Sequence, residues 1–205
     1  QDWWTPATTL MDIRTEFPDG AGRPPYVPKN YDDKEHGLVT VRSALANSYN
    51  IPAVKTLQYV TIPRLIETAE RMGVKSLSGG AYGLSLTLGG GEMTLLELTG
   101  AYAVLANQGV RVPPVAIQCV IGANGQLLGQ GVEELSAAPC REAASQPHGA
   151  LLIEPASGQR AAPASFAYQI TSILADNEAR TPAFGPNSAL RLPGDRPAAV
   201  KTGTT

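Results

Sequence analysis

The sequence predicts a helix-rich α+β domain, and three observations support this. The chain has 205 residues, of which 43% are hydrophobic and 17% charged, so it is long and apolar enough to bury one core. Helical periodicity runs through residues 40–110 and returns near Ser165. Alternating apolar residues before Asn124-Gly125 and a β-branched run after Pro197 predict strands.

The first segment, residues 1–39, has little periodicity. It contains a proline- and glycine-rich stretch from Phe17 to Pro28. Proline removes backbone donors and glycine favours turns, so regular structure is not expected there. We predict a mostly extended segment that follows the surface.

Helices dominate the second segment, residues 40–110. Thr40 is a suitable N-cap for a short helix that ends near Ser48, and Pro52 fits the first turn of the next helix. The tripeptide Ser48-Tyr49-Asn50 is therefore predicted at the junction of two helices.

Two further helices follow in the same segment. One has Pro63 near its start and Gly73 as its stop, and the other starts with the capping box that Thr94 and Glu97 form. Between them, residues 84–88 are predicted as a short strand or extended run stopped by three glycines. No Gly-x-x-x-x-Gly-Lys is present, which argues against a phosphate-binding loop.

The last two segments carry the predicted strands. Residues 111–164 are expected to form a hairpin around Asn124-Gly125 and then an irregular insert. Residues 165–205 are expected to form a helix and a final strand that carries Lys201-Thr202-Gly203. Cys119 and Cys140 could pair, but their spacing does not decide it.

Composition excludes several classes of function. A net charge of -2 without any basic block argues against nucleic acid, and no apolar run is long enough to cross a bilayer. His36 and His148 have no carboxylate or thiol nearby at ligand spacing, so both are interpreted as solvated loop residues. We therefore expect no metal and no cofactor.

Two short motifs carry the chemistry, Ser48-Tyr49-Asn50 and Lys201-Thr202-Gly203. Each alone would occur by chance in many chains, so their joint order and spacing give them their value. A Lys-Thr-Gly-Thr run also follows the nucleophilic aspartate of P-type ATPases. Val200 stands where that aspartate is required, which excludes this alternative.

The flanking sequence resembles the transpeptidase domain of class A (bifunctional) penicillin-binding proteins. S-x-N-type and K-T-G motifs belong to the set shared by penicillin-binding proteins and class A β-lactamases. The similarity extends over nearly the whole chain and weakens only between about residues 126 and 164. It includes the runs Thr5–Thr8, Tyr26–Asp32, Ser48–Val54, Gly83–Leu98 and Ala101–Val110. The implied fold packs helices on an antiparallel sheet, here its helical part with an incomplete sheet, so that residues 1–205 form a partial domain.

The resemblance implies a carboxylate-binding role for the second motif. Lys201 would supply positive charge near the substrate's terminal carboxylate, and the hydroxyls of Thr202 and Thr204 would hydrogen-bond it. Gly203 would permit close approach of the backbone. An exposed strand edge at residues 200–205 could also pair with an extended peptide.

It also implies catalytic roles for the first motif. Ser48 would relay a proton toward the leaving amine, and Asn50 would hold the amide of the acyl side chain and orient the catalytic lysine. Tyr49 is a spacer in this interpretation. Taken alone, Asn50 could equally be the N-cap of the helix that contains Pro52, a common position for asparagine.

The nucleophile of this family lies in S-x-x-K, and no serine of this chain has a lysine three residues later. We expect that motif upstream of Gln1 in a longer parent protein, and we predict that the isolated chain is inactive.

The parent is expected to be a peptidoglycan D,D-transpeptidase on the extracytoplasmic side of the bacterial inner membrane. Its partners would be stem peptides, β-lactams and the missing segments, with the membrane reached only through a missing N-terminal anchor. The alternatives are a D,D-carboxypeptidase or β-lactamase-like enzyme and a non-catalytic peptidoglycan-peptide binding module.

Overall fold

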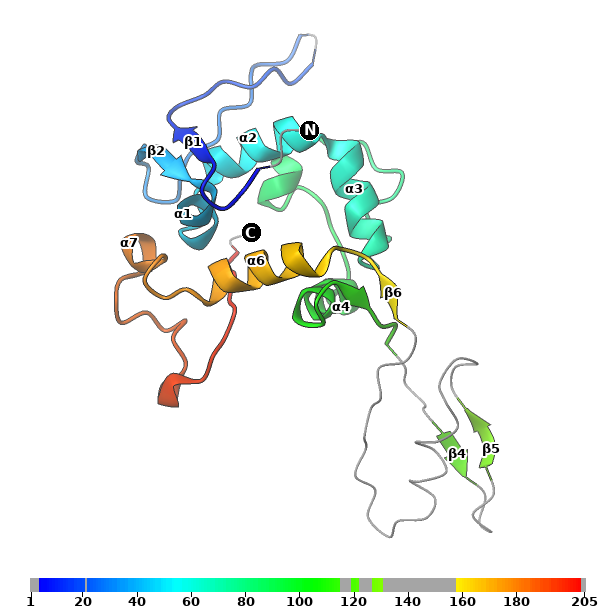
Figure 1. The fold of residues 1–205 in the computed structure, drawn as a ribbon. Helices are drawn as coiled ribbons and strands as arrows, with labels where there is room; N and C mark the ends of the chain where they lie inside the picture. The colour runs from blue at the N-terminus through cyan, green and yellow to red at the C-terminus, as the bar shows by residue number, and fades with distance from the viewer. Residues whose placement is uncertain (1–3, 21, 115–118, 122–126, 131–157, 204–205) are drawn as a thin grey trace.

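The computed structural model describes residues 4–20, 22–114, 119–121, 127–130 and 158–203 as an arrangement of helices with small sheets (Figure 1). The helices are α1 (Val41–Ala46), α2 (Asn50–Val60), α3 (Ile62–Arg71), η1 (Leu84–Leu88), α4 (Leu95–Ala106), α6 (Ala164–Ala175), α7 (Thr181–Phe184) and η2 (Pro193–Asp195). The strands are β1 (Thr9–Asp12), β2 (Gly37–Thr40), β3 (Val110–Arg111), β4 (Cys119–Ile121), β5 (Leu127–Gln130) and β6 (Gln159–Arg160).

The helix boundaries expected from caps are confirmed. The Thr40 side chain accepts a hydrogen bond from the Ser43 backbone at the start of α1. Thr94 and Glu97 form both bonds of the capping box at the start of α4. After α3, Gly73 takes a φ of 101°, the left-handed conformation that ends a helix at low cost.

The prediction of a strand over residues 84–88 is wrong, because these residues form the 3₁₀ helix η1. Gly89, with a φ of 97°, ends it, so the glycines close a tight turn and do not stop a strand. η1 packs on α2 and buries Leu86 against Leu57, Val74 and Leu77. The alternating leucines serve this local packing, and no neighbouring strand pairs with them in the described structure.

Residues 1–39 are extended but also contribute to the core, which corrects the expectation of a surface segment. β1 pairs antiparallel with β2, and Thr9 lies opposite Thr40. Phe17 is bridged by its backbone to Tyr26 with N–O distances of 2.9 and 2.8 Å, and its side chain is buried. A buried aromatic ring ties down a segment that has almost no helix or strand of its own.

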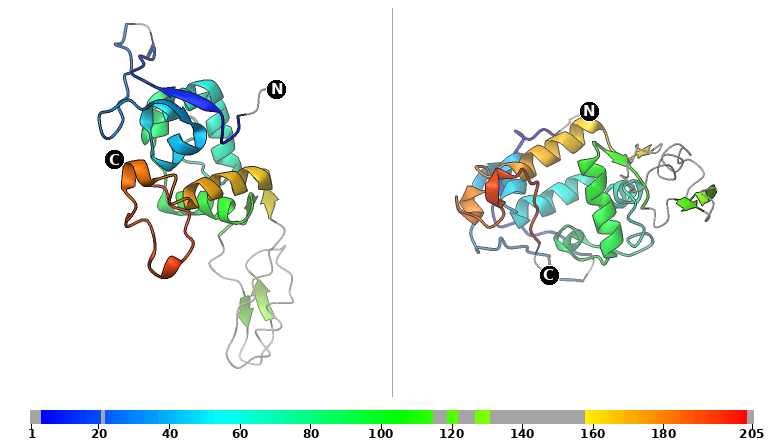
Figure 2. Two further views of the ribbon diagram at one scale, coloured as in Figure 1. Left: turned by 60° about the vertical axis from the view of Figure 1, so that its left-hand side comes forward. Right: turned by 90° about the horizontal axis from the view of Figure 1, so that it is seen from below.

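The long helix α6 joins distant parts of the chain. It lies against α4 on one side and α1 on the other (Figures 1 and 2). Arg42 of α1 reaches across to Asp176 at 2.9 Å, just after the end of α6. Because α1 precedes the Ser48 motif and residues after α7 lead to Lys201, this packing brings the two motifs toward each other.

The strand predictions for the last two segments are met only in part. β4 and β5 pair antiparallel as the hairpin prediction requires, whereas Asn124-Gly125 and residues 131–157 lie outside the described residues. Lys201–Gly203 are irregular and form no strand. Val200 donates to the Leu174 carbonyl at 3.0 Å, so this end of the chain is attached to a helix and not to a sheet.

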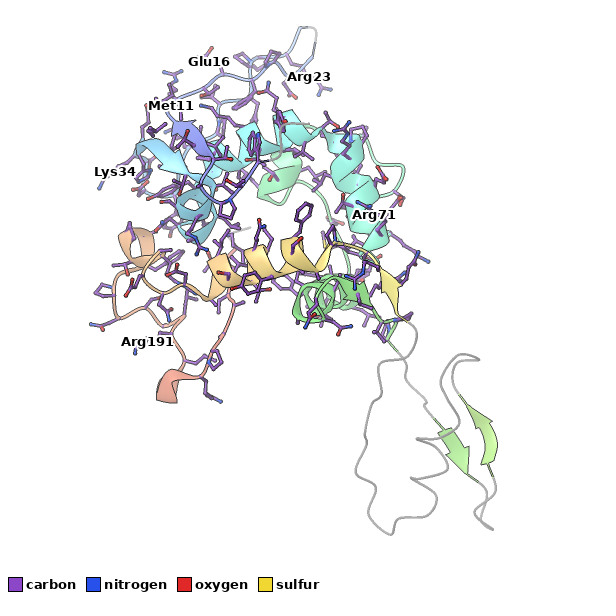
Figure 3. All side chains as sticks on the ribbon, in the orientation of Figure 1. Met11, Glu16, Arg23, Lys34, Arg71 and Arg191 are labelled. Carbon is purple, nitrogen blue, oxygen red and sulfur yellow. The ribbon has the colours of Figure 1, made fainter. Side chains whose placement is uncertain are left out.

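The surface of the described residues mixes charged and apolar side chains. Figure 3 shows Glu16, Arg23 and Arg71 at the periphery, and all three are exposed. α4 is unusually apolar for an exposed helix, and Leu95 and Leu96 are 79% and 64% exposed. No helix in the described ranges combines the length and hydropathy that crossing a bilayer requires.

Glu97 fastens the start of α4 to the preceding loop, which gives a pH-dependent contribution to stability. Its carboxylate accepts from the Ser76 hydroxyl and from the backbone N–H groups of Lys75 and Thr94. These bonds lower the pKa of Glu97 to about 2, with Ser76 the largest cause. The stabilisation is therefore complete above the unfolded pKa of 4.5 and is lost as the pH falls toward 2.

We predict that Glu97→Gln lowers the thermal midpoint at pH 7, because an amide places donors against these donors. The difference from wild type should shrink as the pH falls from 4.5 toward 2. Thermal denaturation of both proteins across this range measures it, with exposed Glu92→Gln as the matched control. A difference independent of pH would contradict the assignment.

Candidate active site

Ser48 occupies a conformation that usually belongs to glycine. It follows α1 with a φ of 59°, and the bonds from Ser48 N to Leu45 O and from Tyr49 N to Ala44 O form a Schellman motif around it. A left-handed serine costs on the order of 1 kcal/mol relative to glycine. The hydroxyl is retained at that cost, which suggests that the oxygen itself is used.

Asn47 fixes this turn from the preceding residue. Its buried side chain donates to the carbonyls of Ser43 and Ala179, at 2.9 and 2.8 Å, and accepts from the Ala183 N–H at 2.9 Å. The end of α1 is thereby bonded to the loop after α6 and to α7. Ser48 is consequently anchored to the part of the chain that leads to Lys201.

Lys201 meets Ser48 although 153 positions separate them in the chain. The Lys201 Nζ donates to Ser48 Oγ at 2.7 Å and to the Thr202 carbonyl at 2.8 Å. An ammonium has three N–H donors, so one remains for another acceptor. Because Lys201 donates to the hydroxyl oxygen, the hydroxyl proton of Ser48 is free to be donated elsewhere.

The charge of Lys201 is poorly compensated. Across the described part of the chain, no carboxylate lies within ion-pair distance of its Nζ. Burial disfavours the ammonium and lowers the pKa of Lys201 below its usual value. An incoming anion would therefore find a partly desolvated cation, for which charge-assisted hydrogen bonds are strong.

A cavity of about 360 Å³ connects the two motifs, and Ser48, Tyr49, Asn50 and Lys201 all contribute to its wall. The rest of the wall is mainly apolar, from residues that include Leu10, Val41, Leu57, Leu88 and Ile170. An apolar wall explains the desolvation of Lys201. The cavity has the size and the small set of converging polar groups expected of a ligand site.

Asn50 is the first residue of α2, and it does not cap that helix. Tyr49 takes the N-cap position and makes no capping bond with its side chain. The Asn50 side chain instead donates to the Lys29 carbonyl at 2.7 Å, which leaves its Oδ1 as an acceptor at the cavity wall. The alternative of Asn50 as N-cap is therefore wrong.

The remaining predicted site residues are placed only in part. Thr202 is half-buried, and Gly203 is exposed with open space where a Cβ would stand. Thr204 lies outside the described residues. Open space beside Gly203 leaves room for a ligand backbone but does not by itself demand glycine.

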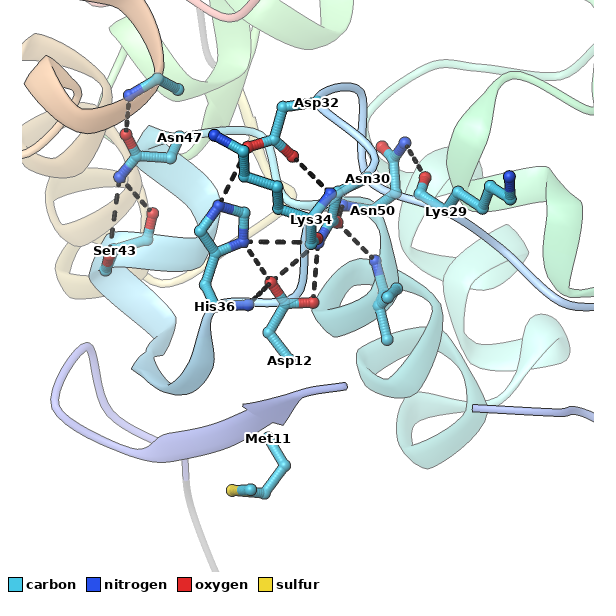
Figure 4. A network of polar contacts seen from close by, with 12 residues as sticks. Met11, Asp12, Lys29, Asn30, Asp32, Lys34, His36, Ser43, Asn47 and Asn50 are labelled. Carbon is cyan, nitrogen blue, oxygen red and sulfur yellow. Dashed lines mark hydrogen bonds and ion pairs between the residues drawn. The ribbon is translucent and has the colours of Figure 1, made fainter. Parts of the chain in front are cut away.

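The sequence interpretation missed a polar cluster behind the first motif. His36 was expected to be a solvated loop residue, yet its Nδ1 lies 2.6 Å from the buried carboxylate of Asp12 (Figure 4). Its ring also stacks on Tyr49 at a centroid distance of 3.9 Å, so Tyr49 is more than a spacer. A separation of 24 residues hid this contact, since Asp12 and His36 come together only when β1 pairs with β2.

A metal site is absent from the residues that the structure describes, where no group of three or more His, Cys, Asp or Glu side chains could hold an ion. His148 and Cys140 lie outside those residues.

Comparison with known families decides the identity of the domain. Residues 12–205 match the model of the penicillin-binding protein transpeptidase domain. The chain belongs to this family. The resemblance inferred from the two motifs and their flanks is thus confirmed, and so is the expected fold class.

Individual relatives agree with this family assignment. A penicillin-binding protein 1A of Aquifex aeolicus is 40% identical over 60% of this chain and 16% of its own length. A penicillin-binding protein 1A of Rickettsia bellii is 29% identical over 98% of this chain and 24% of its own length. The chain therefore spans less than a quarter of these curated relatives.

Solved structures show the same fold. Penicillin-binding protein 1A from Haemophilus influenzae is similar at 25% identity with a TM-score of 0.67, over 86% of this chain and 27% of that one. PonA1 from Mycobacterium tuberculosis gives a TM-score of 0.73 at 20% identity, over 98% of this chain and 48% of that one. PonA1 has also been solved in complex with penicillin V.

Proposed function

We propose that this chain contributes the S-x-N and K-T-G side of a peptidoglycan D,D-transpeptidase site. The observation that carries the proposal is the contact of Lys201 with Ser48 at the wall of a cavity that Asn50 also lines. A proton donor, an amide and an uncompensated cation at one cavity suit the binding and cleavage of a peptide that ends in a carboxylate.

Each group has a role that follows from its contacts. Lys201 binds the terminal carboxylate of a stem peptide, or the carboxylate of a β-lactam, together with the hydroxyls of Thr202 and Thr204. Ser48, whose oxygen already accepts from Lys201, passes its proton to the leaving amine. Asn50 holds the amide of the acyl side chain through Oδ1.

Acyl transfer also needs a nucleophile that this chain does not contain. A serine must form the acyl-enzyme and a base must accept its proton, and S-x-x-K is not present in the sequence. We infer that a longer parent protein supplies this motif to the same cavity, on the extracytoplasmic side of the bacterial inner membrane. The isolated chain should then bind penicillin only noncovalently.

Labelling with a fluorescent penicillin tests this proposal. We expect a covalent adduct on the full-length protein, mapped by mass spectrometry to the serine of an S-x-x-K motif, and none on the 205-residue chain. An adduct on the isolated chain would refute its predicted inactivity. Absence of any adduct on the full-length protein would refute the enzymatic assignment and favour a non-catalytic peptide-binding module.

The acyl acceptor separates transpeptidation from the related hydrolytic activities. With a labelled stem peptide and a second peptide amine, the full-length protein should form the cross-linked product. Release of free acid alone would identify a D,D-carboxypeptidase. Rapid turnover of penicillin without a lasting adduct would identify a β-lactamase-like enzyme.

A further inference from the structure

The residues after Ser48 are held by a buried polar cluster that comes from the first 36 residues. Asp12 is fully buried, and its carboxylate accepts from the His36 Nδ1 at 2.6 Å, from the His36 backbone at 3.1 Å and from the Asn30 amide at 2.8 and 2.9 Å. Figure 4 shows these three side chains beside the start of α2. The buried charge is thus stabilised by several donors, as buried charges require.

Asn30 transmits this arrangement to α2. Its Oδ1 accepts from the backbone N–H groups of Asn50 and Ile51, at 2.9 and 3.3 Å. These are donors of the first turn, which no local N-cap side chain satisfies. Asn30, which is 4% exposed, therefore caps α2 from 20 residues upstream.

The orientation of the Asn30 amide is determined by its partners. Its nitrogen faces both oxygens of Asp12 and the Lys34 carbonyl, whereas its oxygen faces two N–H groups. A flipped amide would set donors against donors and its oxygen against a carboxylate. Asp12 thus decides which atom of Asn30 faces the helix.

Two further contacts act on the same three-residue stretch. The Lys29 carbonyl accepts from the Asn50 side chain, and the His36 ring stacks on Tyr49 at an interplanar angle of 14°. Burial, followed by the charges of Asp32 and Asp12, raises the pKa of Tyr49, so its ring stays neutral. Every residue from Tyr49 to Ile51 is consequently held from residues 29–36.

We propose that Asn30, oriented by Asp12 and His36, is a positioning residue for the reaction, and that this cluster fixes Ser48 and Asn50 at the cavity wall opposite Lys201. This inference rests on the proposed function. Ser48 is in a left-handed conformation that its own backbone disfavours, so it needs restraint on both sides. Asn47 restrains it from α1 and the Asn30 cluster restrains it from α2.

An exchange of charge between positions 12 and 30 tests the proposal in the full-length protein. Asn30→Asp sets two carboxylates against each other, which should displace the start of α2. The double variant Asp12→Asn/Asn30→Asp restores a donor facing a carboxylate, and the carboxylate still accepts from Asn50 and Ile51. Exposed Asn187→Asp adds the same charge as a control.

The measurement is the first-order rate constant of acylation at saturating labelled penicillin, at a temperature where circular dichroism shows every variant folded. We expect Asn30→Asp to lower it about 10- to 100-fold, since small misplacements of reacting groups have effects of this size. The double variant should recover to within about fivefold of wild type, because the lost bond to the Lys34 carbonyl is worth roughly 1 kcal/mol. Asn187→Asp should match wild type.

The outcomes distinguish the two proposals. If wild type forms no adduct, the proposed function fails, and the positioning role fails with it. If wild type is acylated but the single variant is unimpaired, or the double variant is no faster than the single one, only the positioning role is overturned. Should Asn30→Asp not fold, the recovery of the double variant relative to Asp12→Asn decides the question.

Discussion

Replacing Lys201 by alanine should reduce the second-order rate of penicillin acylation of the full-length protein about 100-fold or more. The substitution removes the cation proposed to bind the substrate carboxylate, and charge-assisted hydrogen bonds contribute about 1.5–3 kcal/mol each. It also removes the donor to Ser48 Oγ, which orients the proposed proton relay. Stopped-flow labelling with fluorescent penicillin measures the rate, and Lys75→Ala removes an exposed lysine as the matched control.

The pH dependence of wild type provides an independent check on Lys201. Burial lowers the pKa of Lys201, so its positive charge is lost at a lower pH than for a free lysine, whose pKa is about 10.4. Acylation should therefore decline on the alkaline side below that value. Lys201→Arg keeps its charge throughout, so its residual activity should not decline there. A decline of equal position in both proteins would assign it to another group.

Replacing Ser48 by glycine should have opposite effects on activity and stability when it is compared with alanine. Both variants lack the hydroxyl, so both should lose about 100-fold or more in acylation, the size expected for loss of a general acid. Glycine tolerates the φ of 59° and alanine does not. Ser48→Gly should thus be more stable than Ser48→Ala by about 1 kcal/mol.

Urea unfolding of the chain and penicillin labelling of the full-length protein measure the two effects separately. Thr61→Gly and Thr61→Ala form a control pair, since Thr61 has a φ of 74° and does not contribute to the wall of the cavity. That pair should show the same order of stability without a loss of acylation. Near wild-type acylation by Ser48→Gly would refute the proton relay.

Local sequence patterns predicted the helices well because their determinants lie within a few residues. The N-cap at Thr40, the capping box of Thr94 and Glu97, and the stop at Gly73 all depend on neighbouring backbone groups. The error at residues 84–88 has a different origin. Alternating leucines satisfy a strand pattern, but packing of Leu86 against α2 selected a 3₁₀ helix.

The two motifs and their flanks were sufficient to predict the family and the fold class. They could not reveal what holds the first motif in place. Asp12, Asn30 and His36 are spread over 24 residues, and no sequence spacing marks a carboxylate, an amide and an imidazole that meet only after β1 and β2 pair. The same limit explains why His36 was mistaken for a solvated residue.

Sequence order therefore determined which side chains are available for chemistry, namely a serine, an asparagine and a lysine in two recognisable motifs. Tertiary structure alone decided that Lys201 donates to Ser48 across 153 positions, and that burial lowers its pKa. The physical reason is that a motif fixes the type and order of groups over a few bonds. Distance, desolvation and hydrogen-bond direction between two motifs depend on the packing of the helices that separate them.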